Sequence, residues 1–463
     1  MTAGEVRRLD ARVAEYSDFA EIMMANQPPW QTEGRADIAF LRGNFGHMTV
    51  PVVEFSSEGY GEQQQTSMTL SEYLDAVREG RHTQDGADQE PGRGGRGGGG
   101  SGGGRGDGGG PFLYLKDWHF QRLRKDGMGA ASGETPFFFA DDWLNWWCDS
   151  NEQDDYRFVY IGPEGSWTPL HHDVLNSYSW SFNICGSKHW TLFPTESTPD
   201  LYDRHSRDLA TDVRTGRVDA DRFPRLEGTS RLEVLQGPGE AIFVPSGWHH
   251  QVVNVGDGSP HGGLTISVNT NWFNGFNLDR VHSFLLSELS AVRDALDHLR
   301  EGMSGGDGAG AGLEWERQCE LVMRANSALN MTDFARVVVA RARELPSAAA
   351  AAARDPRHDC CRGGGSGDKR GDQGGVYAWR EERWKVLALK QIRAVLLNLL
   401  TAPCAHHIFL GDGDGRRGND DGDTGTPGEE EEAAGRSIGE VDEGTLEEAL
   451  ASVEAALIGE SCP

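Results

Sequence analysis

The sequence predicts a mainly β core, a sandwich or barrel, between an N-terminal α/β segment and a C-terminal helical bundle. Residues 111–278 alternate short strand-like stretches with Gly, Pro and Asn turns, which is typical of such a core. Beyond residue 278 the apolar period changes from two to three and four, which is typical of amphipathic helices.

The N-terminal α/β segment is predicted over residues 1–90. A helical pattern around Tyr16–Met24 precedes a strand-like Met48–Phe55, and a second helix begins at Thr69 or Ser71. We therefore expect two helices and at least one strand before the core.

The C-terminal helical region is predicted over residues 279–400, with Asn277 expected to cap its first helix. Further helical patterns run over 313–328, 332–345 and 377–400. The first helix carries apolar residues at spacings of three and four: Val281, Leu285, Leu289, Val292, Leu296 and Leu299.

Low-complexity stretches separate the N-terminal segment from the β core and interrupt the C-terminal helical region. Residues 91–110 hold 14 glycines in 20 positions and cannot bury enough apolar surface to order themselves, so we expect a disordered insert. Similar disordered inserts are predicted at 302–312 and 348–375. Residues 411–463 carry 16 acidic and three basic side chains, which predicts a mostly disordered tail with one short helix at Thr445–Leu457.

Charge and cysteine usage narrow the class of protein. The 463 residues contain 44 Lys and Arg against 72 Asp and Glu, a net charge of −28, which disfavours nucleic acid and anionic membranes as direct partners. Seven irregularly spaced cysteines form no disulfide framework and indicate a reducing compartment. Without a secretory leader pattern or a long apolar run, we expect a cytoplasmic protein, and a nuclear location is compatible with the same observations.

The chemistry is concentrated in two stretches of the core. In the first, TPLHHDVLNSYSW, His171 and Asp173 are two residues apart and would point to the same side of a strand. The second resembles the second motif of the cupin superfamily, in which a tight Pro-x-Gly turn, here Pro245 to Gly247, leads to an inward-facing histidine, His250.

Two imidazoles and one carboxylate can hold one face of Fe(II) and leave the other face open to a chelating cosubstrate and O₂. A His-x-Asp pair alone is most often a surface turn, but the pair, the turn histidine and the β-rich context together favour a metal site. His172 and His249 would point to the opposite face, so they are not expected to be ligands.

With Lys188, seventeen residues after the first histidine, these motifs resemble the JmjC-domain 2-oxoglutarate oxygenases. The resemblance implies that residues 111–278 form a double-stranded β-helix, the cupin/JmjC barrel. The sequence segments around these residues most resemble those of release-factor lysyl hydroxylases of that family. The segments are DDYRFVYIGPEGSWTPLHHDVLNSYSW, VPSGWHHQV and NTNWFNGFNL.

The resemblance implies a role for each matching residue. His171, Asp173 and His250 would hold Fe(II), and Lys188 would pair with the distal carboxylate of 2-oxoglutarate. The remaining residues expected near the cosubstrate are Thr168, Tyr114, Ser181 and Asn269.

The function that the resemblance implies is an Fe(II)- and 2-oxoglutarate-dependent protein hydroxylase that forms succinate and CO₂. Its expected partner is a protein substrate, a translation release factor hydroxylated at C4 of a lysine, and a homodimer through the C-terminal helices is a further expectation. Two alternatives remain: a histone N-methyl-lysine demethylase, and a catalytically silent JmjC interaction module. Intact His171, Asp173, His250 and Lys188 argue against the silent module.

Overall fold

The chain folds into a β-rich unit and a helical unit. The β-rich unit is built from described residues up to 140, from 156–173 and from 179–271, and the helical unit from 141–155, 174–178 and residues after 271. The computed structural model describes residues 30–32, 34–55, 64–79, 112–120, 122, 139–255, 263–303, 308–352, 374–401 and 441–459. The helix expected at Tyr16–Met24 and the insert expected at 91–110 lie outside these residues.

The larger of the two main sheets has seven strands in the order β11-β8-β13-β6-β5-β3-β4. Each pairing in it whose register is described is antiparallel. Its strands are β3 (Thr49–Phe55), β4 (Gln64–Thr69), β5 (Phe112–Trp118), β6 (Arg157–Pro163), β8 (Tyr178–Cys185), β11 (Ala241–Val244) and β13 (Leu264–Trp272).

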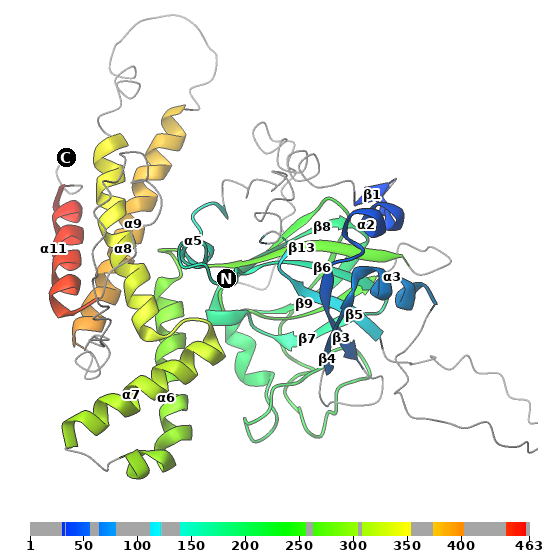
Figure 1. Ribbon diagram of the computed structural model, residues 1–463, viewed down its shortest axis with the longest axis horizontal. Helices are drawn as coiled ribbons and strands as arrows, with labels where there is room; N and C mark the ends of the chain where they lie inside the picture. Colours follow the sequence, from blue (N-terminus) through cyan, green and yellow to red (C-terminus); the bar gives the residue numbers. More distant parts are fainter. Residues whose placement is uncertain are drawn as a thin grey trace, which may run out of the picture. The chain divides into compact units, whose positions relative to one another are not determined.

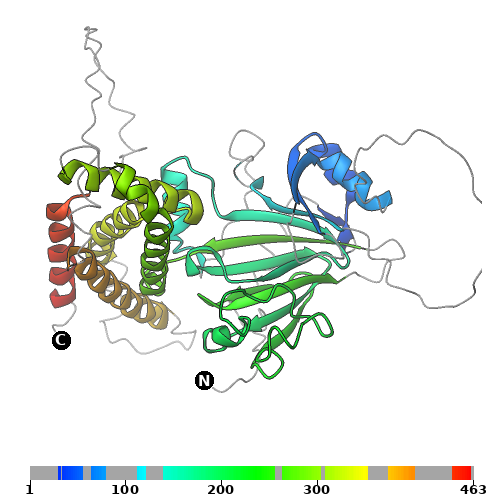
Figure 2. The same cartoon turned by 90° about the horizontal axis from the view of Figure 1, so that it is seen from below.

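The smaller sheet has four antiparallel strands in the order β10-β9-β12-β7. From β6 to β13 successive strands alternate between the sheets, except that β9 and β10 both belong to the smaller one. The Lys188 ammonium of the smaller sheet donates to Ser267 of the larger at 2.6 Å, so the two inner faces oppose each other (Figure 2). This confirms the predicted double-stranded β-helix. The strands are β7 (Trp167–His171), β9 (Ser187–Phe193), β10 (Leu232–Gln236) and β12 (His249–Val255).

The N-terminal segment widens the larger sheet. Strands β3 and β4 follow β5 at its edge, and helix α3 (Leu70–Glu79) begins after Thr69, as predicted. Thr69 and Glu72 cap that helix reciprocally, since the Glu72 carboxylate accepts from the Thr69 amide at 2.8 Å and the Thr69 hydroxyl accepts from the Glu72 amide at 3.2 Å. The other helix is α2 (Ile38–Phe45), and β1 (Gln31–Thr32) pairs with β2 (Arg35–Ala36).

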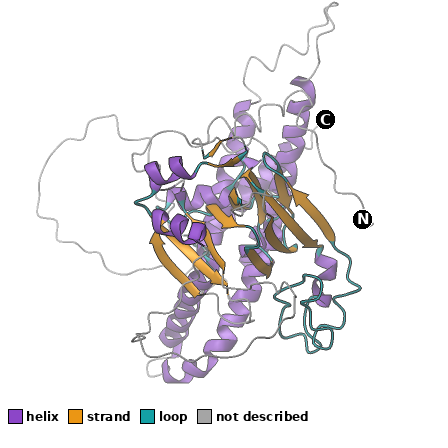
Figure 3. Ribbon diagram, turned by 90° about the vertical axis from the view of Figure 1, so that its right-hand side faces the viewer, coloured by secondary structure: helices purple, strands orange, loops and turns teal. Residues whose placement is uncertain are grey.

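A long connection between β9 and β10, mostly loop (teal in Figure 3), covers the outer face of the smaller sheet. Leu170 and Phe193 of the sheet pack there with Leu201 of the connection. The Gln251 amide of β12 donates to Asp212 at 2.9 Å and accepts from the Val213 amide at 2.7 Å. The connection therefore covers this face through an apolar cluster and through hydrogen bonds to Gln251.

The helical unit contains six named helices, of which α8, α9 and α11 pack against one another (Figure 1). Its helices are α5 (Trp143–Ser150), α6 (Leu278–Met303), α7 (Gly308–Ser327), α8 (Met331–Ala352), α9 (Gly374–Thr401) and α11 (Glu443–Gly459). The predicted helical patterns are thus present, and α7 and α9 begin within the stretches expected as inserts at 302–312 and 348–375. No helix among the described residues is long and apolar enough to cross a membrane.

Asn277 precedes α6 as expected, but its side chain accepts from the Asn274 amide at 3.0 Å rather than from a helix amide. Trp143 and Trp147 of α5 are buried in the helical unit, as their helical spacing indicates. The three cysteines that the structure describes, Cys148, Cys185 and Cys319, are free thiols.

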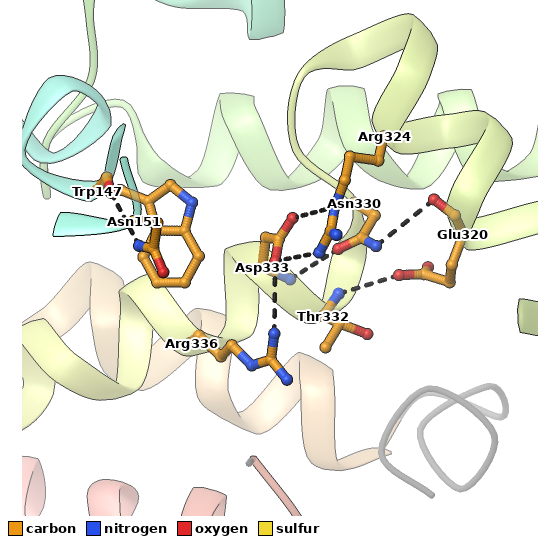
Figure 4. Close-up of polar contacts among 8 residues, drawn as sticks. All are labelled: Trp147, Asn151, Glu320, Arg324, Asn330, Thr332, Asp333 and Arg336. Atoms are coloured by element: carbon orange, nitrogen blue, oxygen red, sulfur yellow. Dashed lines mark hydrogen bonds and ion pairs between the residues drawn. The ribbon is translucent and has the colours of Figure 1, made fainter. Parts of the chain in front are cut away.

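The corner between α7 and α8 is held by a buried carboxylate (Figure 4). Asp333 accepts from both Arg324 nitrogens at 2.7 and 2.6 Å, and the Asn330 side chain accepts from the Asp333 amide at 2.8 Å. Glu320 of α7 accepts from the Thr332 amide at 3.2 Å. These bonds satisfy amides in the first turn of α8 that have no partner within the helix.

We predict that Asp333→Ala lowers the free energy of unfolding of the helical unit by about 2–3 kcal/mol, because it leaves the Arg324 guanidinium without its carboxylate. Urea denaturation followed by hydrogen exchange in α8 measures this effect. Glu314→Ala, which removes an exposed carboxylate, is the matched control and should change stability by less than about 0.5 kcal/mol. Equal effects of the two variants would contradict this account of the corner.

Candidate active site

Strands β7 and β12 bring the three predicted metal ligands together. His171 ends β7 and pairs in register with His250 of β12, while Asp173 follows two residues later. One ligand atom from each residue lies within 4.8 Å of the others, and the two imidazole ring centroids are 4.3 Å apart. Two imidazoles and one carboxylate at this spacing fit a divalent first-row metal such as Fe(II).

The backbone orients both imidazoles in the same way. Nδ1 of His171 lies 2.8 Å from the Pro169 carbonyl, and Nδ1 of His250 lies 3.2 Å from the Trp248 carbonyl. A carbonyl only accepts, so each Nδ1 carries the proton and each Nε2 keeps its lone pair for a metal. The predicted turn before His250 is present, with Gly247 at a φ of 74° that favours glycine.

Two side chains of the larger sheet hold the Asp173 carboxylate. The Ser179 hydroxyl donates to one oxygen at 2.7 Å, and the Asn271 amide donates to the other at 2.8 Å. Both residues lie on the polar faces that the alternating sequence predicts, but nothing in the sequence marks them as partners of Asp173. They fix the direction of the carboxylate toward the two imidazoles.

Burial is the largest cause that lowers the pKa of His171, and the neighbouring His250 lowers it further. The imidazole therefore stays neutral near pH 7, which is the form that binds a metal. His172 and His249 face away from the ligand group, as expected, with ring centroids 5.2 Å apart.

Lys188 of β9 is buried between the two sheets. Its ammonium donates to Ser267 at 2.6 Å and, more weakly, to Ser181 and Asn269 at 3.4 Å each. Ser181 and Asn269 were expected to contact the cosubstrate, and the structure places them against this ammonium. Ser267 was not predicted as a site residue, although it lies on the same polar face as Asn269.

All three acceptors of Lys188 are uncharged, and no carboxylate of the described residues forms an ion pair with it. Burial lowers the pKa of Lys188 to about 7, and the nearby charge of Lys116 contributes. A cation buried without a counter-charge is unstable unless an anion joins it. The arrangement is thus built to receive an anionic group of a ligand.

A bulge in β7 places Thr168 on the same face as His171. In the pairing with β12, Thr168 lies opposite Val252 and His171 opposite His250, so three steps along β7 match two along β12. His250 and Val252 share a face, and therefore so do their partners. The Thr168 hydroxyl makes no hydrogen bond to the described part of the chain, which leaves it available to a ligand.

Tyr114 of β5 is buried beside Asn254, which lies opposite Lys188 in the smaller sheet. The Asn254 side chain hydrogen-bonds the Tyr114 hydroxyl and donates to Ser166 at 2.8 Å. Gly162 is required here, because a Cβ would lie 2.5 Å from the Ser166 Oγ and 2.6 Å from the Tyr114 ring. Tyr114 thus lies at the Lys188 end of the site.

Comparison with known proteins was consistent with this geometry. The Cupin-like domain family matches residues 58–278. A zebrafish protein named "2-oxoglutarate and iron-dependent oxygenase JMJD4" is 38% identical over 309 residues, which cover 66% of this chain and 64% of the relative. The chain thus spans somewhat less than two thirds of that relative.

Two further relatives match a larger share of this chain and of their own length. The chicken protein of the same name is 35% identical over 338 residues, 69% of this chain and 70% of the relative. An Arabidopsis protein named "Arginine-specific demethylase JMJ20" is 31% identical over 362 residues, 72% of this chain and 69% of the relative.

We predict that Asn271→Ala weakens metal binding by about 10- to 100-fold, because Asp173 loses one of the two donors that orient it. Titration with Co(II), followed by visible absorption, measures the affinity. Ser283→Ala removes an exposed hydroxyl of α6 and serves as control. An unchanged affinity in Asn271→Ala would show that this amide does not position the carboxylate.

We also predict that 2-oxoglutarate binding takes up a proton at pH 8 and almost none at pH 6. Free Lys188, with a pKa of about 7, is mostly neutral at pH 8, whereas a bound carboxylate favours the ammonium. Affinity should therefore fall as pH rises above 7. Calorimetry in buffers of different ionisation enthalpy counts the protons taken up on binding. Lys188→Arg, whose side chain stays charged at pH 8, should lose the proton uptake that Lys188 causes.

Proposed function

This chain belongs to the JmjC-type, cupin-like family of 2-oxoglutarate- and iron-dependent oxygenases, and we propose that it is a peptidyl-lysine hydroxylase of that family. The single observation that carries the oxygenase function is the presence of two groups on one face of the smaller sheet. His171 and His250 with Asp173 form the first group, and Lys188, a buried ammonium without a counter-charge, lies opposite Asn254 further along β12 on the same face as His250.

In this proposal His171, Asp173 and His250 hold Fe(II). Lys188 binds the distal carboxylate of 2-oxoglutarate, with Thr168 and Tyr114 as hydroxyl donors to the same group. When bound, Fe(II), 2-oxoglutarate and O₂ supply the oxidising power for a C–H hydroxylation that also yields succinate and CO₂.

The protein's own contribution is position and environment. The Pro169 and Trp248 carbonyls hold the imidazoles, and Ser179 and Asn271 hold the carboxylate, so the donor atoms converge before a metal arrives. Lys188 fixes the cosubstrate at its far end, which sets the distance of its other end from the ligand group. The connection between β9 and β10 covers the outer face of the smaller sheet, which shields this side of the interior from water.

For the substrate, we propose C4 hydroxylation of a lysine in a translation release factor. Two observations support this substrate. The sequence segments around the proposed ligands resemble those of release-factor lysyl hydroxylases, and the chain is similar to proteins named JMJD4. The alternative is N-methyl demethylation, of histone methyl-lysine or of methyl-arginine, since the Arabidopsis relative is named an arginine-specific demethylase.

We further propose a cytoplasmic location and a homodimer through the C-terminal helices. Light scattering of the purified chain would contradict the dimer if it gave the monomer mass at micromolar concentration.

The test of the substrate is a succinate assay with Fe(II) and 2-oxoglutarate, combined with mass spectrometry of the protein substrate. We expect succinate to rise with intact release factor, one added oxygen on a lysine, and loss of both in Asp173→Ala by more than about 100-fold. Methylated histone and arginine peptides are the comparison. Demethylation of those peptides without release-factor hydroxylation would favour the alternative.

A further inference from the structure

A second buried lysine, Lys116, lies near Lys188 and has no role in the function described above. Of the lysines whose side chains the structure describes, Lys188 and Lys116 are 2% and 8% exposed, whereas Lys390 lies on the surface. Lys116 belongs to β5, two residues after Tyr114, so the two side chains share the inner face of the larger sheet.

A β-bulge in β5 places Lys116 beside Tyr160. Leu115 pairs with Ile161 and Trp118 with Val159, so Lys116 and Asp117 together lie opposite the single residue Tyr160 of β6. Asp117 has a φ of 57°, in the left-handed region that is unfavourable for a residue with a side chain. Strain of this kind persists where the surrounding structure enforces it, and it is common at ligand sites.

Tyr160 contacts both residues of the bulge. Its hydroxyl donates to the Asp117 carboxylate at 2.7 Å, and its ring centroid lies 5.7 Å from the Lys116 ammonium. The Lys188 ammonium is 5.6 Å from the same ring. The two ammonium groups therefore border one aromatic side chain, whose ring attracts both cations.

The two ammonium groups differ in what occupies their donors. Lys188 has three oxygen acceptors, whereas Lys116 has neither a hydrogen bond nor an ion pair with the described residues, and Asp117 gives it no ion pair either. Its neighbours are the faces of Tyr114 and Tyr160, at 5.9 and 5.7 Å. Three N–H donors of a buried cation are thus free for a ligand.

Lys116 also lies close to Lys188, since its charge contributes to the lowered pKa of that ammonium. Burial lowers the pKa of Lys116 itself, and the charge of the nearby Asp117 carboxylate acts in the opposite direction. An ammonium in this interior, without a hydrogen-bond acceptor among the described residues, is suited to bind an anionic ligand.

We propose that Lys116 is a second ammonium donor to the distal carboxylate of the cosubstrate, which both Lys116 and Lys188 would bind beside Tyr160. This inference rests on the proposed function, because it assumes a dicarboxylate at Lys188. It makes Lys116 a specificity-determining residue, one that selects 2-oxo acids with a carboxylate at the far end.

The experiment compares two ligands of Mn(II)-loaded protein by calorimetry: 2-oxoglutarate, and 2-oxopentanoate, which has a methyl group in place of the distal carboxylate. We expect Lys116→Met to weaken 2-oxoglutarate binding by about 10- to 100-fold and 2-oxopentanoate binding by less than about 2-fold. Lys116→Arg, which keeps the charge, should recover part of the preference. Lys390→Met is the matched control on an exposed lysine and should change neither affinity.

Thermal unfolding of the same variants separates this role from a structural one. Lys116→Met should melt at the wild-type temperature or higher, because methionine fills the same space without an unpaired charge. Equal changes for both ligands, or no change for either, would overturn the proposal for Lys116 alone. Wild-type protein that fails to bind 2-oxoglutarate would overturn the proposed function together with it.

Discussion

The interior of this protein is organised around a buried ammonium that has no negative partner. Lys188 lies between two sheets, and its acceptors are the uncharged side chains of Ser181, Ser267 and Asn269. A wholly apolar interior could not hold that charge, so polar side chains of the larger sheet surround it, while the same face of the smaller sheet also carries the apolar Trp190, Leu192 and Val252. The alternation of polar and apolar residues along β8 and β13 follows from this requirement, with the apolar residues packed on the outer faces.

Two bulges adapt the regular sheets to the site. In β7 one extra residue brings Thr168 to the face of His171, although a regular strand would put residues three apart on opposite sides. In β5 one extra residue sets Lys116 and Asp117 against Tyr160. Both bulges contain or position residues that we propose to contact the cosubstrate, Thr168 and Lys116, and each bulge changes the direction in which these side chains point.

Much of this arrangement could be predicted from local sequence. His171 and Asp173 two apart, and His250 after a Pro-x-Gly turn, indicate a metal group. The strand expected to carry both ligands ends at His171, however, and Ser179 and Asn271 orient Asp173 beyond it. The helices after Asn277 follow from apolar periodicity. In the same way, the polar alternation in β8 and β13 predicted an inner face before the sheets were known.

Other features depend on contacts between distant parts of the chain. Ser179 and Asn271 serve Asp173 only because β8 and β13 are neighbours in the larger sheet. In the sequence, Lys116 lies in a stretch that reads as a regular strand. The bulge that sets it against Tyr160 is a property of the pairing between β5 and β6, so β5 alone does not predict it. The joining of β3 and β4 to the larger sheet likewise has no local signal, since strand order is a long-range property.

The central claim is that the His-Asp-His group and Lys188 form one site for a metal and a 2-oxo dicarboxylate. Anaerobic titration of the protein with Fe(II) and 2-oxoglutarate, monitored for the metal-to-ligand charge-transfer band, tests it most directly. The account predicts a band in the wild type, its loss in His171→Ala, and a much higher half-saturating 2-oxoglutarate concentration in Lys188→Met. Absence of the band in freshly reconstituted wild-type protein, or an equal band in His171→Ala, would contradict it.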